Sequence, residues 1–274
     1  MKKHFYFLSG LPRTGSTVLA SILSQNPDIY ASPSSPLVGL VHGTKEMWDT
    51  AEHVKAYAVP GQIESVLRGI VEGFYAHIDK PFIFDKNRAW PNPVNQDRLT
   101  LALGEMPKLV CTVRSIADIL ASFIALVRKN PDTVSFIDQS LISLGEPLND
   151  SNRCRLLMSK DGHVFQSWSV LHDGFIRYPQ NILFVEYDDL VNDPARELAR
   201  VYSFFDMPTF AHNFTGITNT VQEDDMSAYN MPGMHKIRPV LGKISQDAAK
   251  VLGDDLYRQY QGGEFWHPTW PRAQ

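Results

Sequence analysis

A glycine-bearing turn near the start of the chain has the residue types that bind a phosphate or a sulfate. Residues 7–23 read FLSGLPRTGSTVLASIL, in which four residues separate Gly10 from Gly15. A turn of this kind between a strand and a helix exposes successive backbone N–H groups at the positive end of the helix. In nucleoside triphosphatases a lysine follows the second glycine and reaches the terminal phosphates. Here Ser16 stands at that position and the cation comes earlier, at Arg13, so the turn fits either a different anion or an ordinary surface turn.

Two further segments place basic side chains where apolar runs end. Lys86 follows the run FIFD, and Arg114 follows LVCTV and precedes Ser122 by eight residues. Because ligands of open α/β sheets bind at the carboxyl ends of the strands, both cations are expected near one crevice. A forked guanidinium matches phosphate oxygens, but a lone lysine is usually solvated and a lone arginine often forms a surface ion pair. Each segment alone therefore leaves a purely structural role open.

The elements that must position these residues alternate along the chain. Short apolar runs bounded by turn residues predict strands at 4–9, 82–85, 108–113 and 181–186. Helices are predicted at 16–25, 63–77, 116–128, 164–177 and 194–205. This order predicts an α/β fold: a single domain over 1–274 with a central, mostly parallel sheet flanked by helices, and a P-loop-like strand, loop and helix at the N-terminus. Residues 129–152 lack a periodic pattern and are expected to form an irregular lid.

The composition limits the classes of protein and partner. The 274 residues carry a formal net charge of -4, which argues against a general nucleic-acid binder. No window reaches the roughly 18 apolar residues that span a bilayer, and no cleavage site follows the short apolar run after Lys3. Two cysteines, Cys111 and Cys154, provide neither a disulfide framework nor a metal site. The sequence therefore predicts a soluble, cytoplasmic protein with no membrane, nucleic-acid or metal partner.

The segment LPRTGSTVL resembles the 5′-phosphosulfate loop of the sulfotransferases, in which a proline, a basic residue and a hydroxyl residue also precede the glycine. The resemblance continues in the family's order through FIFDK, KLVCTVRSIADILASF and NILFVEYDDLVNDP, with a weaker match at HKIRPVLGK. It covers residue 4 to about residue 208. The family transfers a sulfuryl group from 3′-phosphoadenosine 5′-phosphosulfate (PAPS) without depending on Mg²⁺. The resemblance thus implies PAPS as the cofactor and explains the absent lysine.

The resemblance also implies roles for individual residues. The nucleotide-binding residues would be Arg13, Thr14, Gly15, Ser16 and Thr17 at the 5′-phosphosulfate, Arg114, Ser122, Lys236 and Arg238 at the 3′-phosphate, and Tyr187 near the adenine. Lys86 matches the family's catalytic lysine, which would stabilise the charge that builds on the leaving oxygen during transfer. Arg13 is a second cation expected near that oxygen.

The catalytic base is the part of the family pattern that this chain does not match. Cytosolic members place a histidine two residues after the lysine, where this chain has Arg88, and tyrosylprotein-type members place a glutamate in the stretch that here reads YASPSSPLV. His42 is the first candidate, ahead of Glu46 and His53, although a surface histidine is the more ordinary explanation. Two alternatives therefore remain: a protein that binds 3′-phosphoadenosine nucleotides without catalysis, and, less favoured, a P-loop kinase. The acceptor, a hydroxyl or an amine, is of unknown class, as is the oligomeric state.

Overall fold

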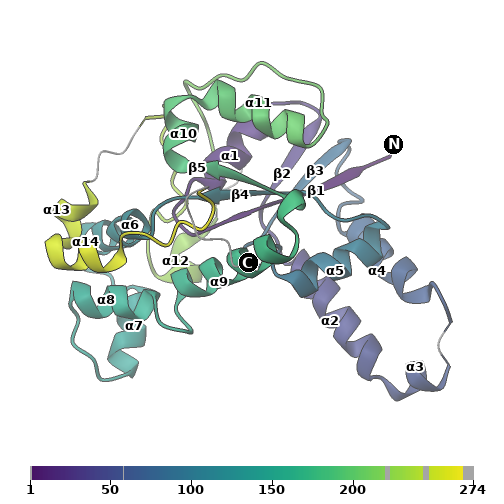
Figure 1. The fold of residues 1–274 in the computed structure, drawn as a ribbon, viewed down its shortest axis with the longest axis horizontal. Helices are drawn as coiled ribbons and strands as arrows, with labels where there is room; N and C mark the ends of the chain where they lie inside the picture. The colour runs from purple at the N-terminus through teal and green to yellow at the C-terminus, as the bar shows by residue number, and fades with distance from the viewer. Residues whose placement is uncertain (1, 58, 220–222, 243–246, 268–274) are drawn as a thin grey trace.

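The computed structural model describes residues 2–57, 59–219, 223–242 and 247–267, and within them five parallel strands form a central sheet (Figure 1). The strands are β1 (His4–Gly10), β2 (Ile29–Ser34), β3 (Phe82–Lys86), β4 (Leu109–Val113) and β5 (Ile182–Glu186), in the spatial order β2-β3-β1-β4-β5. Strand β1 lies at the centre and pairs with β3 on one side and β4 on the other. The predicted α/β fold with a parallel sheet is confirmed.

Helices cover both faces of this sheet, which explains why its strands are apolar on both sides. Successive residues of β1 point to opposite faces: Phe7 packs in one core cluster and Leu8 in the other. The cluster around Phe7 includes residues of α4 (Gln62–Phe74), α5 (Pro93–Leu103), α6 (Ile116–Lys129) and α9 (His163–Arg177). The cluster around Leu8 includes residues of α1 (Ser16–Leu23) and α11 (Pro194–Phe204).

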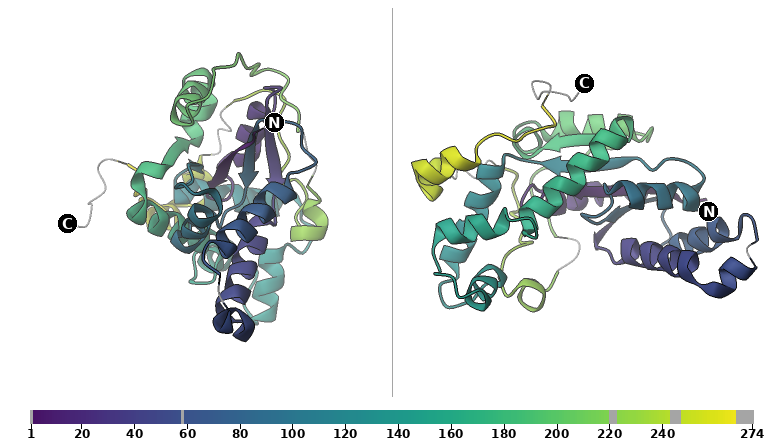
Figure 2. Two further views of the ribbon diagram at one scale, coloured as in Figure 1. Left: turned by 90° about the vertical axis from the view of Figure 1, so that its right-hand side faces the viewer. Right: turned by 60° about the horizontal axis from the view of Figure 1, so that its bottom comes forward.

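The remaining helices lie at the periphery of these layers. They are α2 (Leu37–Thr50), α3 (Glu52–Ala56), α7 (Phe136–Ser143), α8 (Asp150–Leu157), α10 (Tyr187–Asn192), α12 (Asp225–Tyr229), α13 (Ala248–Leu252) and α14 (Asp254–Tyr260), with a 3₁₀ turn at Pro179–Asn181. Figure 2 shows that α2 and α3 extend from one end of the molecule, whereas α13 and α14 lie beside α6 at the other end. Among the helices of the described ranges, none combines the length and the apolar character needed to cross a membrane.

One sequence-based prediction about elements was wrong, and some elements, among them β2 and α5, were not predicted. Strand β2 was not predicted, and it carries Pro33 at the edge of the sheet, where its pairing with β3 shifts register between Ala31 and Ser34. The stretch 129–152, expected to be irregular, contains α7 and the start of α8. Both helices have side-chain caps, because Ser135 accepts a hydrogen bond from the Asp138 N–H and Asn149 accepts one from the Asn152 N–H.

Candidate functional site

A cavity of about 320 Å³ opens at the carboxyl ends of the central strands, where ligands of open α/β sheets bind. Of the predicted site residues, the structure brings these to its wall: Arg13, Gly15, Ser16, Thr17, Lys86, Arg114, Ser122, Tyr187 and Lys236. The chain segment that includes Tyr229 and Met234 closes another side. The predicted residues Thr14, His42 and Arg238 are not among those that line it.

The loop after β1 is held by its own backbone geometry and by β4. Gly15 has φ of 88°, and a Cβ atom there would lie 3.1 Å from Cδ2 of Tyr187, so a glycine is needed for both reasons. Thr14 is buried, and its hydroxyl is within hydrogen-bond distance of the Leu11 carbonyl (2.6 Å) and the Thr112 hydroxyl (2.7 Å). Thr14 therefore braces the loop rather than facing the cavity. Gly15, the N-cap of α1, has no side chain to accept from the first N–H groups of that helix.

Arg13 connects the loop to two other parts of the wall. Its Nε donates a hydrogen bond to the Ser122 hydroxyl of α6 (3.2 Å), and its guanidinium also donates to the Met234 carbonyl. Arg13 adopts φ of 64°, a conformation that is uncommon outside glycine. Burial lowers the pKa of this guanidinium, against an opposing effect of Asp225. The structure thus joins residues that were predicted for opposite ends of one nucleotide.

Arg114 has unused hydrogen-bonding capacity inside the cavity. Its side chain is 9% exposed, its guanidinium carbon lies 4.5 Å from the centroid of the Tyr187 ring, and Nη2 is 3.6 Å from Oδ1 of Asp118. Its Nε is buried and finds no partner among the described residues. A buried donor left unpaired costs free energy unless a ligand satisfies it. Arg114 therefore fits an anion such as a phosphate.

Lys86 lies at the end of β3 and points its ammonium toward the loop. Nζ is 2.9 Å from Oε1 of Glu223 and 3.3 Å from the Thr17 hydroxyl. Its backbone N–H donates to the Ser32 hydroxyl of β2 (2.8 Å), which fixes the strand end. Burial lowers the pKa of Lys86, and the Glu223 carboxylate opposes that shift. A lysine placed in this way can neutralise charge on a bound anion.

Sequence reasoning missed Glu223 and His235. The Glu223 carboxylate also accepts from Ser34, with Oε2 3.2 Å from Oγ. His235 places Nδ1 3.5 Å from Oε2 of Glu223 and 2.5 Å from Oδ1 of Asp225. These residues come from the C-terminal part of the chain, where no hydrophobic period or motif marks them. The only nearby sequence signal was the weak match at HKIRPVLGK.

Arg88, the residue at the histidine position of cytosolic members, also lines the cavity. Its guanidinium is hydrogen-bonded to Nε2 of His163 in α9. Burial, reinforced by Arg88 and His235, lowers the pKa of His163 to about 3. His163 is therefore neutral at physiological pH and can accept from Arg88, so Arg88 keeps its positive charge without a carboxylate at this contact.

His42, the first candidate for a base, lies outside this wall on an exposed part of α2. Its Nδ1 is 3.3 Å from Oδ1 of Asn95, and it also contacts the Arg98 guanidinium. Arg98 pairs in turn with Glu46, the second candidate. His53 lies on α3, which has no buried residue. In the C-terminal segment Arg238 is exposed and lies outside the wall, while Lys236 reaches the cavity.

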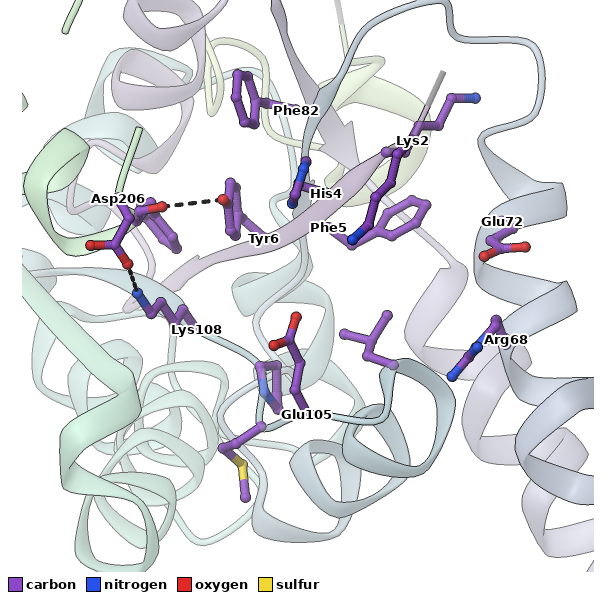
Figure 3. Close-up of a pocket in the computed structure, with 15 residues that line it drawn as sticks. Lys2, His4, Phe5, Tyr6, Arg68, Glu72, Phe82, Glu105, Lys108 and Asp206 are labelled. Atoms are coloured by element: carbon purple, nitrogen blue, oxygen red, sulfur yellow. Dashed lines mark hydrogen bonds and ion pairs between the residues drawn. The ribbon is translucent and has the colours of Figure 1, made fainter. Parts of the chain in front are cut away.

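A larger hollow of about 1000 Å³ lies at the opposite, amino ends of the strands (Figure 3). Its lining contains carboxylates as well as cations: Lys108 pairs with Asp206 at 2.5 Å, and Arg68 and Glu72 come from the same helix. Lys3 donates to a backbone carbonyl, that of Tyr75. The excess of positive charge in this hollow is therefore smaller than in the cavity beside the loop.

Comparison with known proteins shows which family the chain belongs to. A family model described as the sulfotransferase family matches residues 6–211. The chain is 23% identical to protein-tyrosine sulfotransferase A of Caenorhabditis elegans over 212 residues, which are 74% of this chain and 50% of that protein. It is 22% identical to the protein-tyrosine sulfotransferase of Drosophila melanogaster over 204 residues, 74% of this chain and 38% of that protein. This chain thus spans half or less of the length of these two relatives.

A comparison with solved structures also found similar proteins. The sulfotransferase domain from the curacin biosynthetic pathway matches 89% of this chain and 81% of its own with a TM-score of 0.49 and 16% identity. The family model matches the chain from within β1 to beyond α11, a range that includes the loop, Lys86 and Arg114. Since that match covers well over half of the chain, the protein belongs to the sulfotransferase family.

Proposed function

We propose that this protein transfers a sulfuryl group from PAPS to a hydroxyl or amine acceptor. The observation that carries this proposal is a pair of cationic positions on either side of the loop. Lys86 ends β3 and Arg114 follows β4, and both strands pair with β1, which leads into the loop. The two strands lie two strand spacings, about 10 Å, apart across the sheet, and Arg114 lies further along the sheet than Lys86. A nucleotide with one anionic group at each end of its ribose suits this spacing better than a continuous triphosphate.

The residues of the cavity fit such a nucleotide without a lysine after Gly15. The backbone N–H groups at the start of α1, together with Arg13, would hold the 5′-phosphosulfate. Arg114, whose Nε has no partner within the described part of the chain, and Ser122 would hold the 3′-phosphate, while Tyr187 would contact the base. PAPS, when bound, supplies the activated sulfuryl group. The missing P-loop lysine argues against the kinase alternative.

Lys86 is the residue we assign to the chemical step. Its ammonium is fixed between the loop and Glu223, so little reorganisation is needed when negative charge develops on the leaving oxygen. A cation placed there stabilises the transition state more than the ground state. Arg13 and Arg88 add positive charge to the same cavity.

The acceptor is proposed from the relatives alone. Both curated relatives are named protein-tyrosine sulfotransferases, so a phenol, and a tyrosine-containing peptide in particular, is the first acceptor class to test. Four properties of the protein remain predictions: PAPS as the donor, the cytoplasmic location, the lack of a nucleic-acid partner, and the extent of a single domain over 1–274.

Single-turnover transfer from PAPS labelled in its sulfuryl group tests the proposal. The acceptors are a tyrosine-containing peptide, simple phenols, alcohols and amines, and the product is labelled acceptor. We expect transfer to at least one acceptor without added Mg²⁺. Tight binding of 3′-phosphoadenosine 5′-phosphate (PAP) with no transfer to any acceptor would favour the non-catalytic alternative.

A further inference from the structure

Transfer to a hydroxyl requires a group that removes the acceptor's proton, and a carboxylate lies beside Lys86. Among the described residues, the carboxylate paired with the Lys86 ammonium is that of Glu223, at 2.9 Å. The Glu223 side chain is 15% exposed, so it is sheltered but can still be reached by a ligand. Lys86 is the cation that would stabilise the negative charge on the leaving oxygen. A base beside this lysine therefore lies close to the reacting atoms.

We propose that Glu223 is the general base of the transfer, an inference that rests on the proposed function. In this step a lone pair of the acceptor oxygen forms the new O–S bond while the S–O bond to the phosphate breaks. The electron pair of the broken bond stays on the phosphate oxygen beside Lys86. The proton of the acceptor hydroxyl passes to a carboxylate oxygen of Glu223, which later returns it to water.

The surroundings of Glu223 hold its carboxylate in place and keep it ionised. The Ser34 N–H lies 3.3 Å from Oε1 and the Ser34 hydroxyl 3.2 Å from Oε2. Burial raises the pKa of Glu223, but the Lys86 ammonium and His235 outweigh burial and hold that pKa below its ordinary value. At neutral pH the carboxylate is therefore free to accept a proton.

Charged groups from the end of β3 and from the C-terminal segment face this carboxylate and influence its pKa. Lys86 and Arg88 approach from the end of β3, and Arg88 is close enough to interact with it electrostatically. His235 approaches from the C-terminal segment and is held by Asp225, whose carboxylate accepts from the His235 backbone N–H (2.9 Å) and lies 2.5 Å from its Nδ1. His235 is a positioning residue in this arrangement, because it touches Glu223 rather than the reacting atoms.

The ion pair with Lys86 has a simpler explanation, in which Glu223 is only a counter-ion that a bound anion displaces. The two roles differ in what a neutral side chain does. If Glu223 only neutralises Lys86, Glu223→Gln should bind nucleotide more tightly and transfer at least as fast. If it removes the proton, transfer should fall for acceptors that must lose a proton and be spared for acceptors that are already ionised.

The experiment compares Glu223→Gln with the native protein in two measurements. Calorimetry gives the dissociation constant of PAP, and single-turnover kinetics at pH 8 give transfer from PAPS to 4-methylphenol, which is protonated, and to 4-nitrophenol, which is ionised. Glu72→Gln is the matched control, because Glu72 is exposed on α4 at the remote hollow (Figure 3).

We expect Glu223→Gln to bind PAP at least as tightly as the native protein. Transfer to 4-methylphenol should fall on the order of 10²- to 10⁴-fold, the usual contribution of a general base, while transfer to 4-nitrophenol changes little. The inference would be overturned if Glu223→Gln transferred sulfate to each phenol at the native rate. It would also be overturned if the variant lost the same factor in rate for both phenols and bound PAP more weakly. If the native protein neither binds PAP nor transfers sulfate, the proposed function fails, and the role of Glu223 fails with it.

Discussion

The Lys86 ammonium contacts the nucleotide loop at Thr17 and, on its other side, the proposed base Glu223. Lys86→Ala is expected to lower the single-turnover rate on the order of 10²- to 10³-fold, as loss of one oxyanion donor does, while PAP affinity changes modestly. Lys86→Arg should recover only part of the rate, because a planar fork does not replace a compact ammonium at one oxygen. Lys108→Ala, at the remote hollow, is the control. Transfer at the native rate by Lys86→Ala would remove this lysine from the mechanism.

Arg114 is expected to give the cavity its preference for nucleotides that carry a 3′-phosphate. Arg114→Ala should remove a charge-assisted hydrogen bond worth about 1.5 to 3 kcal/mol and so narrow the preference for PAP over adenosine 5′-phosphate. Competition binding with the two nucleotides measures this preference. Arg128→Ala, an exposed arginine at the end of α6, should leave it unchanged. If Arg114→Ala discriminates as well as the native protein, the role passes to Lys236.

His163 predicts how stability depends on pH. In the folded protein its pKa is about 3, whereas the ordinary value is 6.5. Between those values the unfolded chain binds a proton at this histidine that the folded protein does not. The contribution of His163 to the free energy of unfolding is therefore fully present above pH 6.5 and is lost as the pH drops toward 3. The loss approaches about 1.4 kcal/mol for each pH unit below 6.5. Urea unfolding at pH 7 and pH 5 gives the free energy of unfolding that is lost on acidification. This loss should be smaller for His163→Gln than for the native protein or for the exposed control His77→Gln. An equal loss in all three proteins would contradict the lowered pKa of His163.

The candidate site was predictable from sequence where strand ends position its residues. The loop, Lys86 and Arg114 each follow an apolar run, and the ends of neighbouring parallel strands must meet at one edge of the sheet. Glu223 and His235 follow no strand and lie on no periodic helix. The positions of these two residues depend on how the C-terminal segment folds back over β2 and β3. A local sequence pattern does not show this long-range contact.

At the scale of elements, four of the five described strands and the helices α1, α4, α6, α9 and α11 were predicted, whereas the edge strand β2 and the helices α5 and α7 were not. The apolar face of α6 defined that helix almost to its ends. Strand β2 reads IYASPS, and its proline and serines resemble a turn until its pairing with β3 is known. The helix α7 is short, and its capping residue Ser135 was the one local sign of its start.

The turn that begins α1 gives a prediction at this scale. Gly15→Ala would place a side chain at φ of 88° and a Cβ 3.1 Å from Tyr187, so it should lower stability by about 1 to 3 kcal/mol and also weaken PAP binding. Gly61→Ala is a matched control, since Gly61 has φ of 78° before α4 and none of the described residues has an atom within 4 Å of the added Cβ. It should lower stability without changing PAP affinity. Equal PAP affinity in both variants would show that the loop conformation is not needed for binding.

At the scale of the whole molecule, overall charge and local charge differ in sign. The chain carries a formal net charge of -4, yet Arg13, Lys86, Arg88 and Arg114 gather around one cavity. The sheet order makes this possible, because it brings the ends of β3, β1 and β4 together from distant parts of the sequence. An acidic protein can therefore still present a cationic cavity of the kind that a strongly anionic nucleotide requires.

Thermal unfolding with and without nucleotide tests the central claim most directly, namely that this cavity binds a 3′-phosphoadenosine nucleotide. A ligand that binds only the folded state at 100 times its dissociation constant adds about 2.7 kcal/mol of stability. For a protein of this size, each kcal/mol corresponds to roughly 2 to 4 °C in Tm. We predict that PAP raises Tm by several degrees, and that ATP with Mg²⁺ at the same concentration does far less. Equal or greater stabilisation by ATP with Mg²⁺ would contradict this claim.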